Sequence, residues 1–142
     1  MLIQLLVAAA VSVCNITIHA LVMTAVVRAA QTMSAKNIKH PVLFLIVTMI
    51  ATVSILMAAH AAEVMVWASA YELVDAAPPG ANLVYFAFVN YTTLGYGDIV
   101  PVPKWQLLGP ITAMNGVLLF GWSTAVIFEV LRKAMLQPPP QN

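Results

Sequence analysis

Three long apolar stretches alternate with short polar segments along the chain. The first runs from Leu2 to Val27 without a charged residue, the second covers residues 41–70, and the third covers residues 104–131. About 20 apolar residues in a helix span the hydrocarbon core of a bilayer, so each stretch is long enough to cross a membrane. The pattern therefore predicts an all-α membrane protein with three transmembrane helices surrounded by a lipid bilayer.

A shorter helix is predicted between the second and third apolar stretches. Residues 71–81 break the apolar pattern with a Pro-Pro-Gly turn at 78–80. Asn82 then provides a suitable N-cap for a helix over residues 82–92. At about 1.5 Å per residue such a helix reaches only half-way across a bilayer. We therefore expect it to be re-entrant, entering and leaving the membrane on the same side.

The composition excludes several functional classes. Of 142 residues, 62% are hydrophobic and 8% are charged, and the mean hydropathy is +0.93, which is more apolar than a soluble domain of this length requires. The net charge of +1 gives no indication of a nucleic-acid partner. The single cysteine, Cys14, excludes an intramolecular disulfide and a cysteine-based zinc site. The few ionisable residues form no nucleophile–base set and no phosphate-binding loop, so we expect neither an enzyme nor an organic cofactor.

The basic residues predict the orientation in the membrane. Arg28, Lys36 and Lys39 lie between the first two apolar stretches, and Arg132 and Lys133 follow the third. Loops rich in lysine and arginine stay in the cytoplasm, which places the N-terminus outside and the C-terminus in the cytoplasm. The re-entrant segment then enters from the outer side. The small size of the chain favours a prokaryotic host, and hence the bacterial inner membrane.

The re-entrant helix leads directly into a glycine-containing run, Thr92-Thr93-Leu94-Gly95-Tyr96-Gly97-Asp98. The two glycines stand two residues apart, and both can adopt positive φ at little steric cost. Alternating the sign of φ along an extended segment turns successive carbonyl groups to one side. The result is a row of oxygen dipoles, with the Thr93 hydroxyl at its lower end, that can replace the water shell of a monovalent cation. We expect Tyr96 and Asp98 to point away from this row and to brace it.

This run resembles the selectivity filter of potassium channels, usually written Thr-Val-Gly-Tyr-Gly-Asp, with Leu94 in place of valine. The resemblance covers a pore domain at 41–133 and leaves out the extra helix and connector at 1–40 and a proline-rich tail at 134–142. It implies a homotetramer with the pore on the four-fold axis, because one chain carries a single pore loop. It also implies K+ ions bound by backbone carbonyls, with the Leu94 side chain directed into the surrounding protein. The implied ligands are Thr93, Leu94, Gly95, Tyr96 and Gly97, with Thr92 and Asp98 as supporting residues.

Other interpretations of the run stay open. It could be a tight glycine turn between two membrane helices. The chain could also be a weakly selective monovalent cation channel, or a non-conducting accessory subunit of a mixed assembly. A pore-loop symporter fits less well, because such proteins fuse several pore segments in one chain and usually keep one glycine per filter.

The resemblance also implies bracing residues on the re-entrant helix. Tyr85 matches a donor in the family and could donate to Asp98. Phe86 stands where the family often has a second donor, and Val89 stands where some relatives have a glutamate. We therefore expect conduction to fail faster at low potassium than in a fully braced filter.

His60 and Glu63 are three residues apart in the second stretch, so they share one helix face near its outer end. Three interpretations compete. They could form a satisfied interfacial pair, Glu63 could accept bonds from backbone N–H groups beside the filter, or His60 could act as a pH sensor. A metal site is the weakest alternative, since two ligands do not complete a coordination shell.

Polar residues in the first helix predict a packing seam rather than a sensor. Asn15 and His19, with Ser12, lie on one face of this helix. We expect them to lie at the same depth in the membrane as Thr48, Thr52 and Ser54 in the second helix. Interhelical hydrogen bonds of this kind contribute about 0.6–2 kcal/mol each. A voltage-sensing helix carries repeated arginines, which this helix lacks.

The third apolar stretch carries candidates for a gate. Gly116 is either a hinge or a site of close helix packing, and Gly121 follows it at a spacing similar to that of inner-helix glycines in the family. Pro110 is expected to kink this helix by removing one backbone hydrogen bond. If Gly116 is the hinge, four side chains face the pore, and a ring of the last one could gate by dewetting. The four are Val117, Phe120, Thr124 and Phe128.

Overall fold

The computed structural model describes residues 1–34 and 40–135, and within these residues the fold is entirely helical. Two long helices, α1 (Leu2–Ser34) and α2 (Pro41–Leu73), are followed by the short helix α3 (Leu83–Tyr91). A single 3₁₀ turn, η1 (Pro103–Trp105), then precedes the last long helix, α4 (Leu108–Met135). All three long helices are long and apolar enough to cross a membrane, as the sequence predicted, and the protein is an integral membrane protein.

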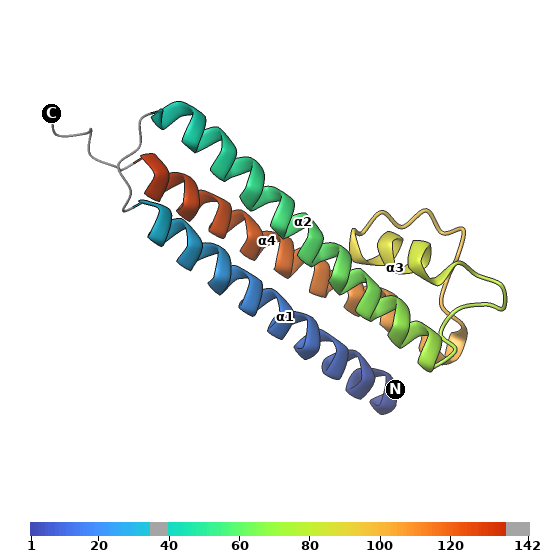
Figure 1. The fold of residues 1–142 in the computed structure, drawn as a ribbon. Coiled ribbons are helices and arrows are strands. Elements are labelled where there is room, and N and C mark those ends of the chain that lie inside the picture. The colour runs from blue at the N-terminus through green and yellow to red at the C-terminus, as the bar shows by residue number, and fades with distance from the viewer. Residues whose placement is uncertain (35–39, 136–142) are drawn as a thin grey trace, which may run out of the picture.

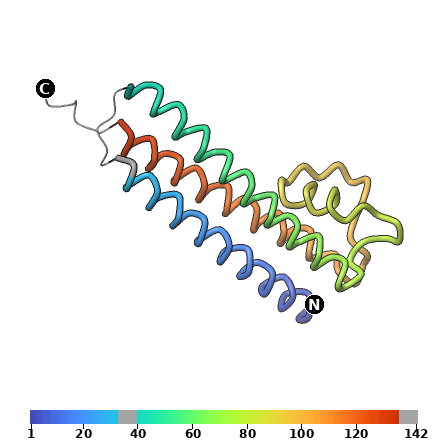
Figure 2. Tube along the Cα trace, viewed as in Figure 1, coloured from blue at the N-terminus to red at the C-terminus, as the bar shows by residue number. Residues whose placement is uncertain are grey.

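The three long helices lie side by side, and α3 packs on one end of the bundle (Figure 1). Helix α1 contacts both α2 and α4, whereas α3 is held between α2 and α4. The trace in Figure 2 shows that α1 and α2 run in opposite directions, so the start of α1 lies beside the end of α2. We call the end that carries α3 the α3 end of the bundle.

Two helices extend further than the sequence predicted. Helix α1 continues past Val27 and Arg28 to Ser34, because the following alanines and glutamine are good helix formers and no glycine or proline interrupts them. Helix α2 continues to Leu73 and includes Tyr71, which was assigned to the break and is fully buried. The connector lysines Lys36 and Lys39 and the tail beyond Met135 lie outside the described residues.

Helix α4 begins at Leu108 rather than at residue 104, which changes the role of Pro110. Pro110 is the third residue of the helix. The first backbone N–H groups of a helix have no intrahelical partner, so proline removes nothing there. The next residue, Ile111, already donates its N–H to the Leu107 carbonyl at 3.2 Å. The predicted kink at Pro110 was therefore based on the wrong helix start.

The buried apolar residues form two clusters along the bundle. The cluster at the α3 end is aromatic and includes Trp67, Tyr71, Phe86 and Tyr91. The cluster at the opposite end is aliphatic and joins α1, α2 and α4 through Met23, Val26, Ala30, Leu56, Val126 and Val130. Large aromatic rings therefore pack around the short helix. The loop that follows this helix has no regular secondary structure of its own.

The segment before α3 is fastened to the segment that follows the glycine-containing loop. After the end of α2, Asp75 takes φ 52°, the Asp75 N–H donates to Glu72 and the Ala76 N–H donates to Tyr71. The Ala76 carbonyl in turn accepts a hydrogen bond of 2.9 Å from the Val102 N–H. A backbone hydrogen bond therefore joins the segment that precedes α3 to the segment that follows the loop.

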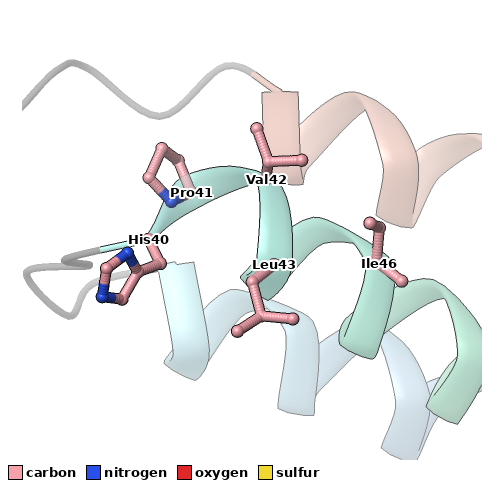
Figure 3. A pocket seen from close by; sticks show the side chains of 5 residues that line it. All are labelled: His40, Pro41, Val42, Leu43 and Ile46. Atoms are coloured by element: carbon pink, nitrogen blue, oxygen red, sulfur yellow. The ribbon is translucent and has the colours of Figure 1, made fainter.

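A shallow hollow of about 490 Å³ lies at the start of α2, at the end of the bundle opposite to α3 (Figure 3). Its walls are His40, Pro41, Val42, Leu43 and Ile46. Four of these five side chains are apolar and none is a carboxylate. The hollow is therefore unsuited to holding a cation and is remote from the glycine-containing loop.

Candidate functional site

Helix α3 has a defined start and end. Its N-cap is Asn82, whose side-chain oxygen accepts a hydrogen bond of 3.1 Å from the Tyr85 N–H, as the sequence predicted. At its other end the Thr93 N–H donates to Asn90 and the Leu94 N–H donates to Val89, at 3.1 and 3.0 Å. This pair of bonds is a Schellman motif, in which the residue after the C-cap takes a left-handed conformation. The end of the helix therefore sets the backbone geometry of the first residues of the loop.

Positive φ recurs at every second residue through the loop. It is 60° at Thr93, 57° at Gly95 and 78° at Gly97, whereas Leu94 and Tyr96 between them do not have positive φ. The two glycines adopt the conformation expected of them. Thr93 was not expected to do so, because a left-handed conformation costs a residue with a Cβ about 1–2 kcal/mol. The one indication of its positive φ in the sequence was its position directly after the C-cap of a helix.

The loop is exposed in a single chain. Residues 92–98 are all exposed, with 51% of Leu94 and 68% of Tyr96 accessible. The Leu94 side chain is therefore not enclosed by its own chain, although the sequence placed it in surrounding protein. Thr92 is the C-cap of α3, and its hydroxyl donates back to the Phe88 carbonyl at 2.7 Å.

One side chain of α3 braces the far end of the loop. The Tyr85 hydroxyl donates a hydrogen bond of 2.7 Å to Asp98 Oδ2, across the loop. The hydrogen bond to the Asp98 carboxylate raises the pKa of the Tyr85 phenol above its ordinary value of 10.0. The phenol therefore remains a donor throughout the physiological pH range.

Substituting Tyr85 by phenylalanine should remove the hydrogen bond to Asp98 and make the loop less stable. The bond contributes stability that is fully present below the unfolded pKa of tyrosine, near 10.0, and is lost as pH rises through the higher folded pKa. We expect ion flux through wild type and Tyr85→Phe to differ at neutral pH and to converge only above the raised pKa of Tyr85. A flux assay in liposomes at decreasing potassium checks this, and identical curves at neutral pH would contradict it.

The other two predicted bracing positions are buried in the core. Phe86 is fully buried, and its ring lies 4.9 Å from that of Tyr71 in α2. Val89 is also buried, and its carbonyl accepts the N–H groups of Leu94 and Gly95. Neither side chain can donate a hydrogen bond to the loop, as the sequence predicted.

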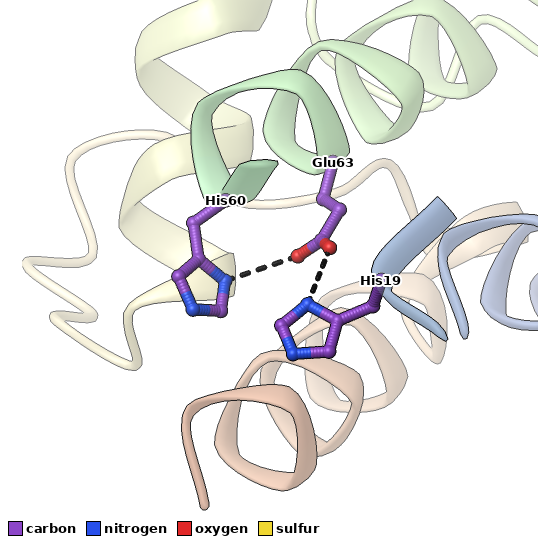
Figure 4. Close-up of side chains that lie close together, drawn as sticks. All are labelled: His19, His60 and Glu63. Carbon is purple, nitrogen blue, oxygen red and sulfur yellow. Dashed lines mark hydrogen bonds and ion pairs between the residues drawn. The ribbon is translucent and has the colours of Figure 1, made fainter. Parts of the chain in front are cut away.

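A network of buried polar side chains lies next to α3, where the long helices meet (Figure 4). Glu63 is fully buried, and its Oε1 lies 2.7 Å from His19 Nδ1 in α1. Its Oε2 lies 3.0 Å from His60 Nδ1 and accepts a hydrogen bond from the Tyr91 hydroxyl. The Nε2 atoms of both histidines face the Ser123 hydroxyl of α4, at 2.9 Å from His60 and 3.3 Å from His19. All four described α-helices contribute to this network.

This network corrects the interpretations of His60 and Glu63. The carboxylate of Glu63 is not paired with backbone N–H groups of the loop, because side chains of α1, α2 and α3 occupy both of its oxygens. The pair does not lie at the outer surface either, since it stands beside His19, near the middle of α1. The sequence showed two possible metal ligands, whereas the structure brings His19, His60 and Glu63 together with ligand atoms within 4.8 Å of one another.

The polar seam of α1 was predicted with the wrong partners. Asn15 and His19 are fully buried, as a seam requires, but they contact Glu63, Asn115 and Ser123. The amide oxygen of Asn115 also accepts the Trp67 indole N–H at 3.1 Å. Since α1 and α2 are antiparallel, residues near the start of one helix lie at the same depth in the bundle as residues near the end of the other. The threonines Thr48 and Thr52 are buried near the other end of the bundle, and Ser54 is exposed.

Gly116 lies where α4 contacts the end of α3. A Cβ atom at Gly116 would stand 2.0 Å from the carbonyl oxygen of Tyr91, which no real Cβ approaches. A Cβ atom at Gly121 would meet nothing within 4 Å. Of the two alternatives for Gly116, the structure therefore supports close packing.

The four side chains predicted to face a pore lie on an exposed stripe of α4. Val117, Phe120, Thr124 and Phe128 are all exposed in the single chain, with 66% of Phe128 accessible. The Phe120 ring also packs against His60, with ring centroids 4.5 Å apart. This stripe and the glycine-containing loop are both exposed in a single chain.

These features define a membrane pore domain, in which a short helix and an irregular loop are held between two membrane-spanning helices. The family described as "Ion channel" matches residues 42–133, which include α2, α3, the loop and most of α4. The chain belongs to this ion-channel family, and α1 is an additional helix that precedes the matched region. Searches of curated proteins and of solved structures gave no significant match.

Proposed function

We propose that the protein is a potassium-selective channel that conducts K+ passively through a homotetrameric pore. The observation that carries the proposal is the recurrence of positive φ at Thr93, Gly95 and Gly97. An alternation of this kind would turn the carbonyl groups of residues 93–97 to one side of the loop. Four such rows around one axis would replace the hydration shell of K+, with the Thr93 hydroxyl as the lowest ligand.

The surfaces left uncovered by one chain support a ring of four copies. The exposed loop and the exposed stripe of α4 would face the axis and the neighbouring subunits, where they would become covered. The C-terminal end of α3 would point its partial negative charge towards the axis, where a cation enters the loop.

The distribution of basic residues supports an orientation with the N-terminus outside and the C-terminus in the cytoplasm of a bacterial inner membrane. The pore loop would then open to the outer side. Phe128 would lie near the cytoplasmic mouth, where a ring of four phenylalanines could close the pore by dewetting.

The test is potassium flux from purified protein in liposomes, compared with sodium flux. Gly97→Ala should lower K+ flux by about tenfold or more, because a left-handed alanine costs about 1–2 kcal/mol in each of four subunits. Gly80→Ala is the matched control, since Gly80 has φ 79° against 78° at Gly97, and neither Cβ would meet an atom within 4 Å. This variant bears the same strain in the turn before α3 and should conduct normally.

Three results would contradict the proposal in different ways. Equal fluxes of sodium and potassium through wild type would indicate a weakly selective cation channel. The absence of any flux from correctly assembled protein would indicate an accessory subunit. Equal losses of flux in Gly80→Ala and Gly97→Ala would show that the loop has no special part in conduction.

A further inference from the structure

We propose that His19, His60 and Glu63 form a binding site for one proton, which joins the additional helix α1 to the end of the pore helix and makes conduction sensitive to pH. The effect on conduction rests on the proposed channel function. The binding of the proton does not, and it can be measured on its own. The site lies outside the glycine-containing loop and borders the exposed stripe of α4, whose Phe120 ring packs against His60.

The site is closed off from other charges. His19 and Glu63 are fully buried, and the His60 side chain is 13% exposed. The facing groups from α3 and α4 are the Tyr91 and Ser123 hydroxyls and the rings of Phe120 and Trp122. None of these carries a charge at neutral pH, so the charge of the site depends on its own protons.

A count of donors and acceptors gives the number of protons. If Glu63 is a carboxylate, it only accepts, so both histidines must donate from Nδ1, at 2.7 and 3.0 Å. His60 Nδ1 also lies 2.9 Å from the Tyr91 oxygen, which can only accept there because its hydroxyl hydrogen is donated to Glu63. Both Nε2 atoms then face Ser123, which has one hydroxyl hydrogen and can donate to only one of them. The other Nε2 must donate to the Ser123 oxygen, and that ring is an imidazolium. Every contact is satisfied with one imidazolium, one neutral imidazole and a carboxylate.

The same number of protons results if the shared proton lies on Glu63. The protonated carboxyl then donates to one Nδ1, and that ring, now neutral, donates from Nε2 to Ser123. The site again carries no net charge. Removing the proton leaves two acceptor nitrogens facing one hydroxyl hydrogen and a net negative charge in an apolar bundle, which is unfavourable.

The site is mechanically connected to the pore. The Tyr91 hydroxyl donates to Glu63, and the Tyr91 carbonyl is packed against Gly116. Tyr91 is the last residue of α3 and lies two positions before Thr93, where the alternation of φ begins. A change in the position of Glu63 is therefore transmitted to the first ligand of the filter. His19 supplies the second imidazole, which gives α1 a role that the two-helix pore lacks.

The first experiment measures the proton directly. ¹⁵N NMR of histidine-labelled protein in nanodiscs distinguishes imidazolium from the neutral tautomers, and the chain has only three histidines, the third being His40. At about pH 7 we expect the His19 and His60 signals to report one shared proton, which His19→Gln abolishes. Two independent neutral rings would overturn the proposal.

The second experiment measures K+ flux in liposomes with the same pH on both sides. Wild-type flux should fall by about tenfold as the pH is raised and the site loses its proton. The fall should be absent in His19→Gln and unchanged in His40→Gln, the control at the exposed start of α2. A pH-independent wild-type flux would overturn the coupling and leave the channel function standing. Absence of flux at every pH would instead refute the channel function, and NMR would still decide the proton site.

A metal ion is the competing occupant, and the same samples exclude or establish it. Titration with Zn²⁺ alone should leave the His19 and His60 signals unchanged at stoichiometric concentration, because their ring nitrogens are already hydrogen-bonded. Binding of one Zn²⁺ per chain, with release of the shared proton and block of flux, would replace the proton site with a metal site.

Discussion

Replacing Gly116 by alanine should disable the channel. The added Cβ would stand 2.0 Å from the Tyr91 carbonyl oxygen and 3.0 Å from its carbonyl carbon. Both are backbone atoms, so no side-chain rotation relieves the contact, and α4 and α3 must move apart. We expect a loss of about 3 kcal/mol in the free energy of unfolding and a K+ flux reduced at least about tenfold. Thermal unfolding in detergent and liposome flux measure the two effects.

Gly121→Ala provides the control within the same helix. A Cβ at this position meets no atom within 4 Å, and alanine favours a helix over glycine by about 0.8–1.0 kcal/mol. This variant should fold at least as well as wild type. If Gly116→Ala conducted normally while remaining folded, α3 would not be fixed by its contact with α4, and the hinge alternative for Gly116 would return.

Glu63→Gln should be the most destabilising change that preserves side-chain volume. Glu63 accepts hydrogen bonds at both oxygens from three different helices, and an amide presents one acceptor and one donor. The new N–H group faces other donors in a closed site. Breaking a buried ionic network of this kind typically costs about 3–5 kcal/mol. We expect the folded protein to be lost at temperatures where wild type is stable, as measured by thermal unfolding and size-exclusion chromatography.

Glu129→Gln is the matched substitution at the other end of the bundle. Glu129 pairs with Arg132 and Lys133 on the partly exposed surface of α4, where ion pairs contribute little. Its stability should stay close to that of wild type. Equal effects of the two substitutions would show that the loss of the carboxylate itself, and not the burial of Glu63, determines its contribution to stability.

The sequence predicted the features that depend on neighbouring residues. The length of the apolar stretches predicted the three membrane helices, and Asn82 predicted the start of α3. The two glycines predicted the positive φ at Gly95 and Gly97. The features that were missed depend on how helices meet. Spacing placed His60 and Glu63 on one face, but no spacing within a helix could show that His19 lies opposite them. Depth estimates failed for Asn15 because they ignored the antiparallel course of α1 and α2.

The conformation of Thr93 was missed for a different reason. Glycine is the usual residue in the left-handed position after a helix, and the sequence has threonine there. A residue that needs only backbone freedom would be glycine, so the side chain must have its own role. The hydroxyl proposed as the lowest ion ligand supplies that role.

The backbone bond from Val102 to Ala76 has a consequence for opening and closing. It ties Ala76, just after the end of α2, to Val102, just before η1 and α4, so these two segments move together as one rim. Any splaying of α4 away from α2 must then increase with distance from this rim. The movement is therefore largest in the half of α4 that lies away from α3, which carries Phe128.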